Sequence, residues 1–399
     1  MKEGWEKMTM LEACDLITCG VAARPKYVDD GIPFLSAKNV KEGQIIYEGY
    51  NCITEENHQE LTKKNKPLVG DILYTRVGSY GEAAVIEEDI EFSVFVSLTL
   101  IKPKKELLNS YFLKYYLNSH EVKTLAKNSI TSSGVGNLNV GTVRKFPIPI
   151  PPLPEQKQIV TLLDKAFAAI DQAQANVEKN MVNAKELFQS KLNEIFSRPA
   201  LSEAEGKGHG WEEKKFKDVC VLQRGFDLPK RLRKEGKYPL VSSSGIIDSH
   251  FEAKVKAPGV VTGRSGSIGN LFYIEDDFWP LNTTLYIKDF KGNFEEYVYY
   301  FIEQFDLKRF SSGAGVPTLN RNFVHDEIVF STNNIELQMK IVNQLNHLKS
   351  ETKEIESQYQ QKLDNLEALK KSILQKAFSG ALTSTSSATA KNATVQKVL

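Results

Sequence analysis

Two short glycine-containing segments each place an arginine beside hydroxyl-bearing side chains, a combination suited to binding phosphates or the edges of bases. They read TRVGSYG at 75–81 and GRSGSIG at 263–269. Glycine lets the backbone approach a ligand closely, and an arginine guanidinium forks onto a phosphate or onto the O6 and N7 atoms of guanine. The same glycines would equally shape a corner of a sheet, with each arginine paired to a carboxylate, so both interpretations stay open.

Two runs rich in serine, glycine and asparagine offer further hydroxyl and amide groups, SSGVGNLN at 132–139 and SSGAGVPTLN at 311–320. Such groups bind bases or phosphates, although structural turns explain the same composition. SAKNV at 36–40 and the serines at the matching place in the second half of the chain are weaker candidates. The candidate DNA-binding residues are Arg76, Ser79, Tyr80, Lys38, Asn39, Ser132, Ser133, Asn137, Asn139, Arg264, Ser265, Ser267, Ser243, Ser244, Ser311, Ser312, Asn320 and Arg321.

The sequence contains no recognisable catalytic motif. An adenine methyltransferase would need a glycine-rich cofactor turn and an Asn/Asp-Pro-Pro-aromatic motif, but the PP pair lies in IPIPPLP at 148–154, with neither flanking residue type. The GVG and GAG tripeptides lack the strand–turn–helix context of a phosphate-binding loop, and no GxxxxGK[ST] run occurs. No histidine–acid cluster suits acid–base or metal catalysis. We therefore predict a protein that is not an enzyme and that has no metal or cofactor of its own.

The composition is that of a globular protein with more than one domain. The chain has 399 residues, of which 41% are hydrophobic and 25% charged, and chains of this length usually divide into several cores. No apolar run approaches the ~20 residues of a membrane helix, and the start lacks a secretory hydrophobic stretch, so we expect a cytoplasmic protein that does not contact a membrane. The net charge of +1 implies that any grip on DNA is local or shared with another protein.

The chain repeats itself in an ordered series of matching segments. GWEKMTMLEAC at 4–14 aligns with GWEEKKFKDVC at 210–220, and the arginine segments and the two serine-rich runs follow in the same order. Residues 153–197 then align with residues 335–379 at a constant offset of 182, without insertion or deletion. Loops tolerate insertions cheaply, so a segment whose length stays fixed indicates a structural constraint on that length.

The fixed segment has the periodicity of a long helix that packs along one face. Between Glu155 and Phe196 there is neither proline nor glycine, and apolar residues recur at spacings of four and three, which is a heptad pattern. A four-residue step, or stutter, interrupts both copies. About 44 residues correspond to roughly 66 Å of helix, and such a helix needs a partner, of which the other copy is the nearest. The alternative is a pair of shorter core helices buried in separate domains.

The predicted pairing residues lie on one stripe of each helix. They are Ile159, Leu163, Ile170, Val177, Met181, Leu192, Ile341, Leu345, Leu348, Ile355, Leu363 and Leu374.

The segments before each helix mix short β-rich runs with turn residues and contain one aromatic-rich helix each, which predicts α+β domains. The predicted fold is therefore two pseudo-symmetric α+β domains joined by two long helices that form an antiparallel coiled coil. We expect domain 1 at 1–152, helix 1 at 153–198, a linker at 199–209, domain 2 at 210–334, helix 2 at 335–379 and a disordered tail at 380–399.

This layout closely resembles the specificity (S) subunit of Type I restriction–modification systems. The resemblance is carried by PIPIPPLPEQKQIV at 147–160, by the two serine-rich runs and by the paired SYG and SIG loops, and it covers about residues 1–380. The second copy departs from the pattern, because FSTNNIELQMKIV at 330–342 lacks the prolines that precede the first helix.

The resemblance implies that each α+β domain is a target-recognition domain that reads one half of an asymmetric, bipartite sequence in double-stranded DNA. It implies that the helices set the gap between the halves and dock two modification (methyltransferase) subunits, and that restriction (endonuclease/translocase) subunits complete the nuclease. Those partners would use S-adenosylmethionine, ATP and Mg²⁺. Two alternatives remain: a stand-alone DNA-binding regulator with two recognition domains, which the near-neutral charge disfavours, and a coiled-coil adaptor that binds only protein.

Overall fold

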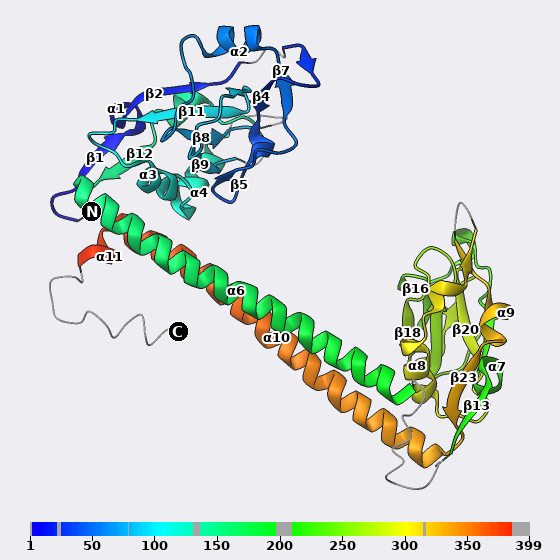
Figure 1. Ribbon diagram of the computed structural model, residues 1–399. Helices are drawn as coiled ribbons and strands as arrows, with labels where there is room; N and C mark the ends of the chain where they lie inside the picture. Colours follow the sequence, from blue (N-terminus) through cyan, green and yellow to red (C-terminus); the bar gives the residue numbers. More distant parts are fainter. Residues whose placement is uncertain are drawn as a thin grey trace. The chain divides into compact units, whose positions relative to one another are not determined.

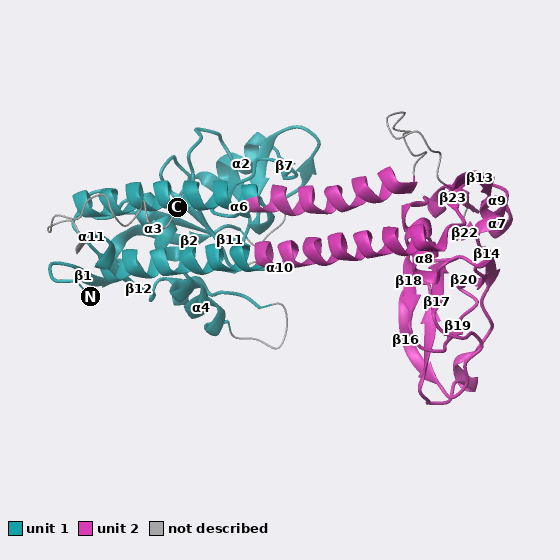
Figure 2. Cartoon of the chain, turned by 90° about the horizontal axis from the view of Figure 1, so that it is seen from below, with its two compact units in different colours: residues 1–176, 361–399 teal, residues 177–360 magenta. Residues whose placement is uncertain are grey.

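The computed structural model describes residues 2–21, 25–78, 80–130, 136–196, 210–313 and 317–384. The chain forms two compact units, which Figure 2 shows in two colours. Unit 1 comprises Met1–Asn176 and Gln361–Leu399, and unit 2 comprises Val177–Gln360. Two long helices, α6 (Leu153–Phe196) and α10 (Ile335–Ser379), run through both units. The first part of α6 and the last part of α10 belong to unit 1, and the remaining parts belong to unit 2.

Unit 1 is built on two four-stranded sheets and two strand pairs (Figure 1). One sheet has the order β2-β11-β8-β9 and is antiparallel throughout, and the other has the order β10-β4-β7-β3 with β10 parallel to β4. β1 pairs with β12, and β5 pairs with β6. In chain order the elements before α6 are β1 (Glu6–Thr9), α1 (Met10–Ala13), β2 (Cys14–Cys19), β3 (Tyr27–Val28), β4 (Ile32–Leu35), η1 (Ala37–Asn39), β5 (Val40–Lys41), β6 (Gln44–Ile45), β7 (Asn51–Ile53), α2 (Glu55–Thr62), β8 (Ile72–Thr75), β9 (Ala83–Val85), β10 (Ser93–Val94), β11 (Leu98–Pro103), α3 (Ser110–Leu117), α4 (His120–Asn128), α5 (Val140–Val143) and β12 (Pro147–Ile150).

Unit 2 repeats the order of the antiparallel four-stranded sheet, but its second sheet has three strands. Its sheets have the orders β14-β20-β17-β18 and β16-β15-β19, with β15 parallel to β19, and β13 pairs with β23. In chain order the elements are β13 (Trp211–Lys215), α7 (Phe216–Val219), β14 (Val221–Arg224), η3 (Lys230–Leu232), β15 (Tyr238–Ser242), β16 (Gly245–His250), β17 (Gly259–Gly263), β18 (Leu271–Ile274), β19 (Trp279–Pro280), β20 (Thr284–Asp289), α8 (Glu295–Gln304), η4 (Leu307–Phe310), β21 (Ser311–Ser312), β22 (Thr318–Leu319), α9 (Arg321–His325) and β23 (Ile328–Thr332).

Unit 1 contains β3 and α2 between its first strand and its arginine loop, and no described element of unit 2 corresponds to them. The two modules therefore share a frame and differ in what is inserted into it. The predicted α+β duplication is confirmed at the level of strand order.

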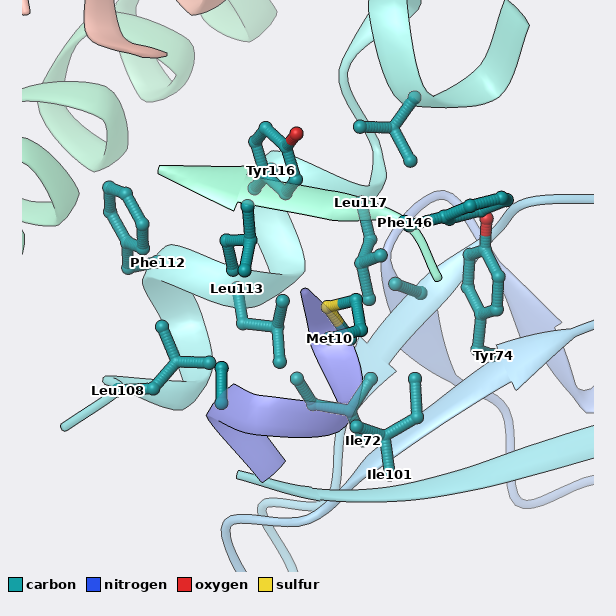
Figure 3. Packing of buried hydrophobic residues seen from close by; sticks show 14 of the residues in the cluster. Met10, Ile72, Tyr74, Ile101, Leu108, Phe112, Leu113, Tyr116, Leu117 and Phe146 are labelled. Carbon is teal, nitrogen blue, oxygen red and sulfur yellow. The ribbon is translucent and has the colours of Figure 1, made fainter. Parts of the chain in front are cut away.

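The core of unit 1 lies between the antiparallel sheet and the aromatic-rich helix α3. Figure 3 shows side chains from α3 packing over those from β8 and β11. The labelled members of this buried cluster are Met10, Ile72, Tyr74, Ile101, Leu108, Phe112, Leu113, Tyr116, Leu117 and Phe146. Apolar burial of this kind supplies most of the free energy that opposes chain entropy.

A buried glutamine in the first turn of each long helix ties that helix to its module. The Gln156 side chain is fully buried; its Oε1 accepts from the N–H of Asn109 at 2.8 Å, and its Nε2 donates to the carbonyls of Leu107 and Pro151. The equivalent side chain in α10, Gln338, makes the same kind of contacts. Buried amides that satisfy their hydrogen-bonding groups in this way fix relative orientation.

Gln338 lies 182 residues after Gln156 and is also fully buried. Its Oε1 accepts from the N–H of Phe294 at 2.8 Å, and its Nε2 donates to Asn293 Oδ1 and to the Thr332 carbonyl, each at 2.6 Å. The two glutamines that the internal repeat aligns thus have the same structural role.

The long helices pair in antiparallel fashion within each unit, as predicted. In unit 1, Ile159 and Leu163 near the start of α6 share a core cluster with Leu374 and Phe378 near the end of α10. In unit 2, Leu192 near the end of α6 shares a cluster with Ile341 and Leu345 near the start of α10.

Most predicted pairing residues are buried or half-buried. Ile159, Leu163, Ile170, Leu192, Ile341, Leu345 and Leu374 are buried, and Val177, Met181, Leu348 and Leu363 are half-buried.

Ile355 is the exception, and its predicted place on the paired face is wrong. Its side chain is 39% exposed, whereas Thr352 and Glu356 are half-buried. The less exposed positions therefore run 348, 352, 356 and 359, which spans 11 residues in three turns. This spacing follows the 3.6-residue repeat of a straight helix more closely than a heptad does. The stutter of α10 consequently begins at Leu348, with steps of four residues to 352 and to 356. This is about one turn earlier than the stutter predicted from the apolar residues, which began at Ile355.

α10 begins without prolines because Asn334 caps it instead. The Oδ1 atom of Asn334 accepts from the N–H of Leu337 at 3.1 Å, which satisfies one of the free donors of the first turn.

The tail is ordered further than predicted. Residues 381–384 form α11 (Ala381–Ser384), and Thr383 is buried beside Glu155, which also accepts from Lys2 Nζ and Trp5 Nε1. Polar partners from the start of the chain and of α6 thus hold a segment whose low-complexity composition alone indicated disorder. The rest of the predicted tail, 385–399, and the predicted linker at 199–209 lie outside the described residues.

Across the described part of the chain, no helix combines the length and the apolar character needed to cross a membrane.

Candidate nucleic-acid interface

The two arginine loops occupy the same backbone frame in both units. The N–H of Arg76 donates to the Ser97 carbonyl at 3.0 Å, and that of Arg264 donates to the Thr283 carbonyl at 2.9 Å. The Arg76 carbonyl accepts from Leu138, and the Arg264 carbonyl accepts from Leu319. Each loop therefore lies beside the segment that contains the serine-rich run of its own unit.

Both loops turn at a glycine with positive φ. Gly81 has φ +82° and Gly269 has φ +81°, a conformation that other residues rarely adopt. The N–H of Gly81 donates to the Thr75 carbonyl and that of Gly269 to the Gly263 carbonyl. The paired glycines of the sequence thus shape the turn that returns each loop to its sheet.

In unit 2 the loop forms one wall of a hollow of about 350 Å³, which we call the arginine pocket. Its charged lining consists of three arginines, Arg224 at the end of β14, Arg264 in the loop and Arg321 at the start of α9. Its remaining lining residues are Leu285, Ser312, Thr318, Leu319, Asn320 and Asn322. The lining therefore contains three guanidinium groups, several hydroxyls and amides, and no carboxylate.

The three arginines are close enough to affect one another. Partial burial, together with the neighbouring charges of Arg224 and Arg321, lowers the pKa of Arg264. Its Nη1 donates to the Asn282 carbonyl at 3.4 Å, a long contact. Like charges brought together in a hollow favour an anionic ligand.

The corresponding place in unit 1 has different chemistry. Arg76 is only 6% exposed; its Nε donates to the Leu138 carbonyl at 3.0 Å and its Nη1 to the Val96 carbonyl at 3.1 Å. This guanidinium is used inside the module, which matches the sheet-corner interpretation, although its partners are carbonyls rather than a carboxylate. A DNA contact by Arg76 would need those bonds to break, so the geometry favours a structural role for it.

The other candidates of unit 1 divide between structural and exposed positions. Asn39 is buried, where its side chain accepts from Ser36 and donates to the carbonyls of Ile46 and Glu48, so its predicted DNA contact lacks an accessible side chain. Lys38 is exposed beside it. The Tyr80 hydroxyl donates to the Gly136 carbonyl at 2.7 Å.

Asn137 and Asn139 are both exposed. Asn137 forms a bridge with Val77, and Asn139 caps α5 by accepting from Gly141. Ser79, Ser132 and Ser133 lie outside the described residues.

The candidates of unit 2 gather around the arginine pocket. Ser312, Asn320 and Arg321 line it, and Ser265 forms a bridge with Thr318 of its lining. Ser243 lies against the same loop, 3.4 Å from the position that a Cβ at Gly266 would take. The remaining candidates are Ser244 in the β15–β16 turn, Ser267 in the loop, and Ser311, whose hydroxyl donates to the Lys308 carbonyl.

Two features escaped the sequence reasoning. Arg224 ends an ordinary strand, so no local motif marks it, and only the fold brings it to the pocket. The second feature is the basic run KRLRKEGK at 230–237, which charge patterning would have revealed. It lies beside β16, because the N–H of Phe251 donates to the Lys234 carbonyl, and Phe251 itself is 53% exposed. Within the described residues, no group of three or more His, Cys, Asp or Glu is placed to hold a metal.

The chain contains two copies of one α+β module. Each copy has its own loops, and each packs against the same pair of long helices. This arrangement is that of a duplicated recognition protein. The comparisons specify which one. The chain belongs to the family described as "Type I restriction modification DNA specificity domain", which matches residues 2–179 and again residues 208–365.

The chain is similar to the EcoBI specificity subunit of Escherichia coli, with 25% identity over 177 residues, which is 44% of this chain and 37% of that protein. It is also similar to the StySPI specificity subunit of Salmonella potsdam, with 28% identity over 205 residues, 48% of this chain and 42% of that protein. The aligned segments thus span less than half of these relatives.

Solved structures share the fold over nearly the whole chain. The HsdS subunit from Thermoanaerobacter tengcongensis superposes with a TM-score of 0.60 at 15% identity, covering 95% of this chain and 97% of its own. A chain from a study of assembly and conformational transition in the type I R-M system reaches a TM-score of 0.78, also at 15% identity, covering 95% and 98%.

Proposed function

We propose that this protein is the DNA sequence-specificity subunit of a Type I restriction–modification complex. Each unit reads one half of an asymmetric, bipartite target in double-stranded DNA. The observation that carries the proposal is one backbone frame, built twice, with different side chains in equivalent loops: Arg264 faces a pocket with Arg224 and Arg321, whereas Arg76 is buried. Unlike loops on a common frame suit two unlike half-sites, since base readout depends on the side chains presented.

The paired helices α6 and α10 set the number of base pairs between the half-sites and dock two modification subunits. Their nearly equal lengths, 44 and 45 residues, support this role, because a rigid element of fixed length restricts half-site spacing, as dimer geometry does in other DNA readers.

Catalysis belongs to partner subunits. The modification subunits transfer a methyl group from S-adenosylmethionine, and the restriction subunits use ATP and Mg²⁺ to cleave; the complex acts in the cytoplasm. The near-neutral net charge of +1 supports a shared grip on DNA, since phosphate neutralisation dominates nucleic-acid affinity.

The test is to map methylated adenines in a host genome with and without this chain, and then to measure binding to the mapped target by the chain alone and with modification subunits. We expect a bipartite, non-palindromic target and selective binding by the assembled complex. Equally selective binding by the chain alone would instead favour a stand-alone regulator. Failure of every assembly to select a sequence would favour a protein-binding adaptor.

A further inference from the structure

The arginine pocket of unit 2 has more positive charge than its neighbouring carboxylates neutralise. Among residues 210–313 and 317–384, Arg264 and Arg321 have no carboxylate within ion-pair distance, and Arg224 has only Asp227 at 3.8 Å. That pair is solvent-exposed, with side chains 51% and 71% accessible, so it is weak. Asp227 also accepts from the Asn282 amide.

The position of Arg264 distinguishes between the two DNA groups that an arginine binds. Its backbone is held on both sides, by the Thr283 carbonyl and the Leu319 N–H. Its half-buried side chain forms part of the pocket wall instead of projecting from the surface. A guanine reader must extend into a major groove about 8.5 Å deep, for which a half-buried guanidinium in a pocket wall is poorly placed. A backbone phosphate lies on the outside of the duplex and fits into such a hollow.

We propose that Arg264 and Arg321, with Arg224 at the rim, clamp one backbone phosphate of the half-site that unit 2 reads. This inference rests on the proposed function and adds which DNA group the pocket binds. Ser312, Asn320 and Asn322 supply hydroxyl and amide groups around the same hollow. Guanidinium groups bind phosphate with charge-assisted, often bidentate hydrogen bonds.

The clamp has no counterpart among the described residues of unit 1. Gly20 and Gly225 occupy equivalent positions, since they donate to the carbonyls of Leu98 and Thr284 at the starts of β11 and β20. The residue before each is Cys19 in unit 1 and Arg224 in unit 2.

The second difference between the two units is the residue that follows the N-cap of α5 in unit 1 and of α9 in unit 2. Asn139 and Asn320 are those caps, and the residue after each is Val140 in unit 1 and Arg321 in unit 2. Arg76 is bonded to two carbonyls, whereas Arg264 and Arg321 line the unit 2 pocket with no carboxylate in ion-pair distance among the described residues.

The experiment uses the complex of the full chain with its modification subunits and a duplex that contains the mapped target. Affinity is measured for wild type, Arg321→Ala and Arg321→Lys at salt concentrations from about 50 to 200 mM, where counterion release dominates. We expect Arg321→Ala to weaken binding about 10- to 100-fold and to make the salt slope shallower by about 0.9, with the preferred target unchanged. Arg321→Lys keeps most of the affinity, because lysine still binds phosphate as a point charge.

A second measurement locates the phosphate. One phosphate at a time is replaced by an uncharged methylphosphonate across the half-site. At one position, the replacement weakens binding by wild type at least as much as Arg321→Ala does. The same replacement weakens Arg321→Ala by a smaller factor, which reflects the contacts of the remaining arginines. The control is Lys215→Ala, which removes a cation that already has its carboxylate, Asp326 at 3.1 Å; its salt slope stays that of wild type.

The outcomes separate the two proposals. Selective binding by wild type combined with wild-type affinity and slope in Arg321→Ala overturns the clamp and leaves the proposed function standing. A changed preference at one base pair in Arg321→Lys also overturns it, because the pocket then reads a base. Absence of selective binding by wild type overturns the proposed function itself.

Discussion

Arg76 and Arg264 show how similar motifs acquire different surroundings in the fold. Both follow the last strand residue before a glycine turn, and both use their backbone groups in the same way. The Arg76 guanidinium is enclosed and bonded to carbonyls, whereas Arg264 shares an open hollow with two further arginines. At the scale of single residues, function therefore depends on side chains that come from distant strands and helices.

A second residue, His325 in α9, makes the stability of unit 2 depend on pH. Its Nε2 accepts from the N–H of Leu222 at 2.9 Å, which requires the neutral ring. Burial, followed by the charge of Arg321, lowers the pKa of His325. The unfolded ring titrates near pH 6.5, so below that value the unfolded state binds more protons than the folded state. The stability that His325 contributes is full above about pH 6.5 and is lost as pH falls through the folded pKa.

In His325→Gln, the amide oxygen of glutamine still accepts from the N–H of Leu222. As pH falls from about 7 to about 5, we expect the free energy of unfolding of this variant to decrease less than that of wild type. Denaturant unfolding at several pH values measures this difference. His347→Gln is the control, because His347 has a side chain 75% exposed on α10. Identical pH profiles for wild type and His325→Gln would contradict the assignment.

At the scale of elements, Gln156 and Gln338 connect each long helix to the module that precedes it. Removing the Gln338 side chain leaves the Phe294 N–H, the Asn293 amide oxygen and the Thr332 carbonyl without their buried partner. Each such group costs about 1–3 kcal/mol. We therefore expect Gln338→Ala to lower the free energy of unfolding by at least that amount in a denaturant titration.

The matched control is Gln189→Ala, since Gln189 lies exposed on α6 and donates to Asn193 in the next turn of the same helix. We expect this substitution to change the free energy of unfolding by no more than about 0.5 kcal/mol. Equal effects of the two substitutions would show that Gln338 does not secure the helix.

The paired face of the long helices supplies a second element-scale prediction. Leu192→Ala removes a side chain that is fully buried in the unit 2 cluster and should cost about 2–5 kcal/mol. Ile355→Ala truncates a side chain that is 39% exposed and should cost less than about 1 kcal/mol. Thermal and denaturant unfolding measure the loss of stability in each variant. A larger loss in Ile355→Ala than in Leu192→Ala would show that Ile355 lies on the paired face, as the heptad pattern predicted.

At the scale of the whole molecule, the duplication gives the ends of α6 and α10 similar aromatic contacts. In unit 1 the ring of Phe378 lies 5.4 Å from that of Phe112 and 5.1 Å from that of Tyr116. In unit 2 the ring of Phe196, 182 residues earlier than Phe378, lies 5.4 Å from that of Tyr297. The end of one helix is thus chemically suited to the place that the other occupies.

We expect a fragment ending at residue 197 to dimerise, because Leu192 and Phe196 of a second copy would take the places of Leu374 and Phe378, which the fragment lacks. Light scattering measures its mass, and such a dimer should read a palindrome of one half-site. Phe196→Ala in the fragment should reduce dimer formation. A monomer with an unfolded helix would argue strongly against exchangeable helix ends.

The sequence by itself determined the features that recur or that depend on near neighbours. The duplication, the two long helices and the α+β character of each module follow from the internal repeat and from residue periodicity, which can be read from the sequence alone. The antiparallel pairing of the helices was an expectation that the structure confirmed. Even the capping of α10 by Asn334 is visible in the sequence, since asparagine is a preferred cap. Ile355 marks the limit of this reasoning, because one residue of drift turns a side chain from the paired face to solvent.

Only the tertiary structure decided which arginines are available to a ligand. Arg224, Arg264 and Arg321 lie up to about a hundred residues apart in the chain, and they meet because β14 and the arginine loop both border β20 while β22 and α9 close the side. Burial and charge at a site are sums over all neighbours, and those neighbours are chosen by strand pairing between distant segments. No local pattern contains that information, so similar motifs at Arg76 and Arg264 predicted equal roles, whereas the fold gives the two guanidinium groups different surroundings.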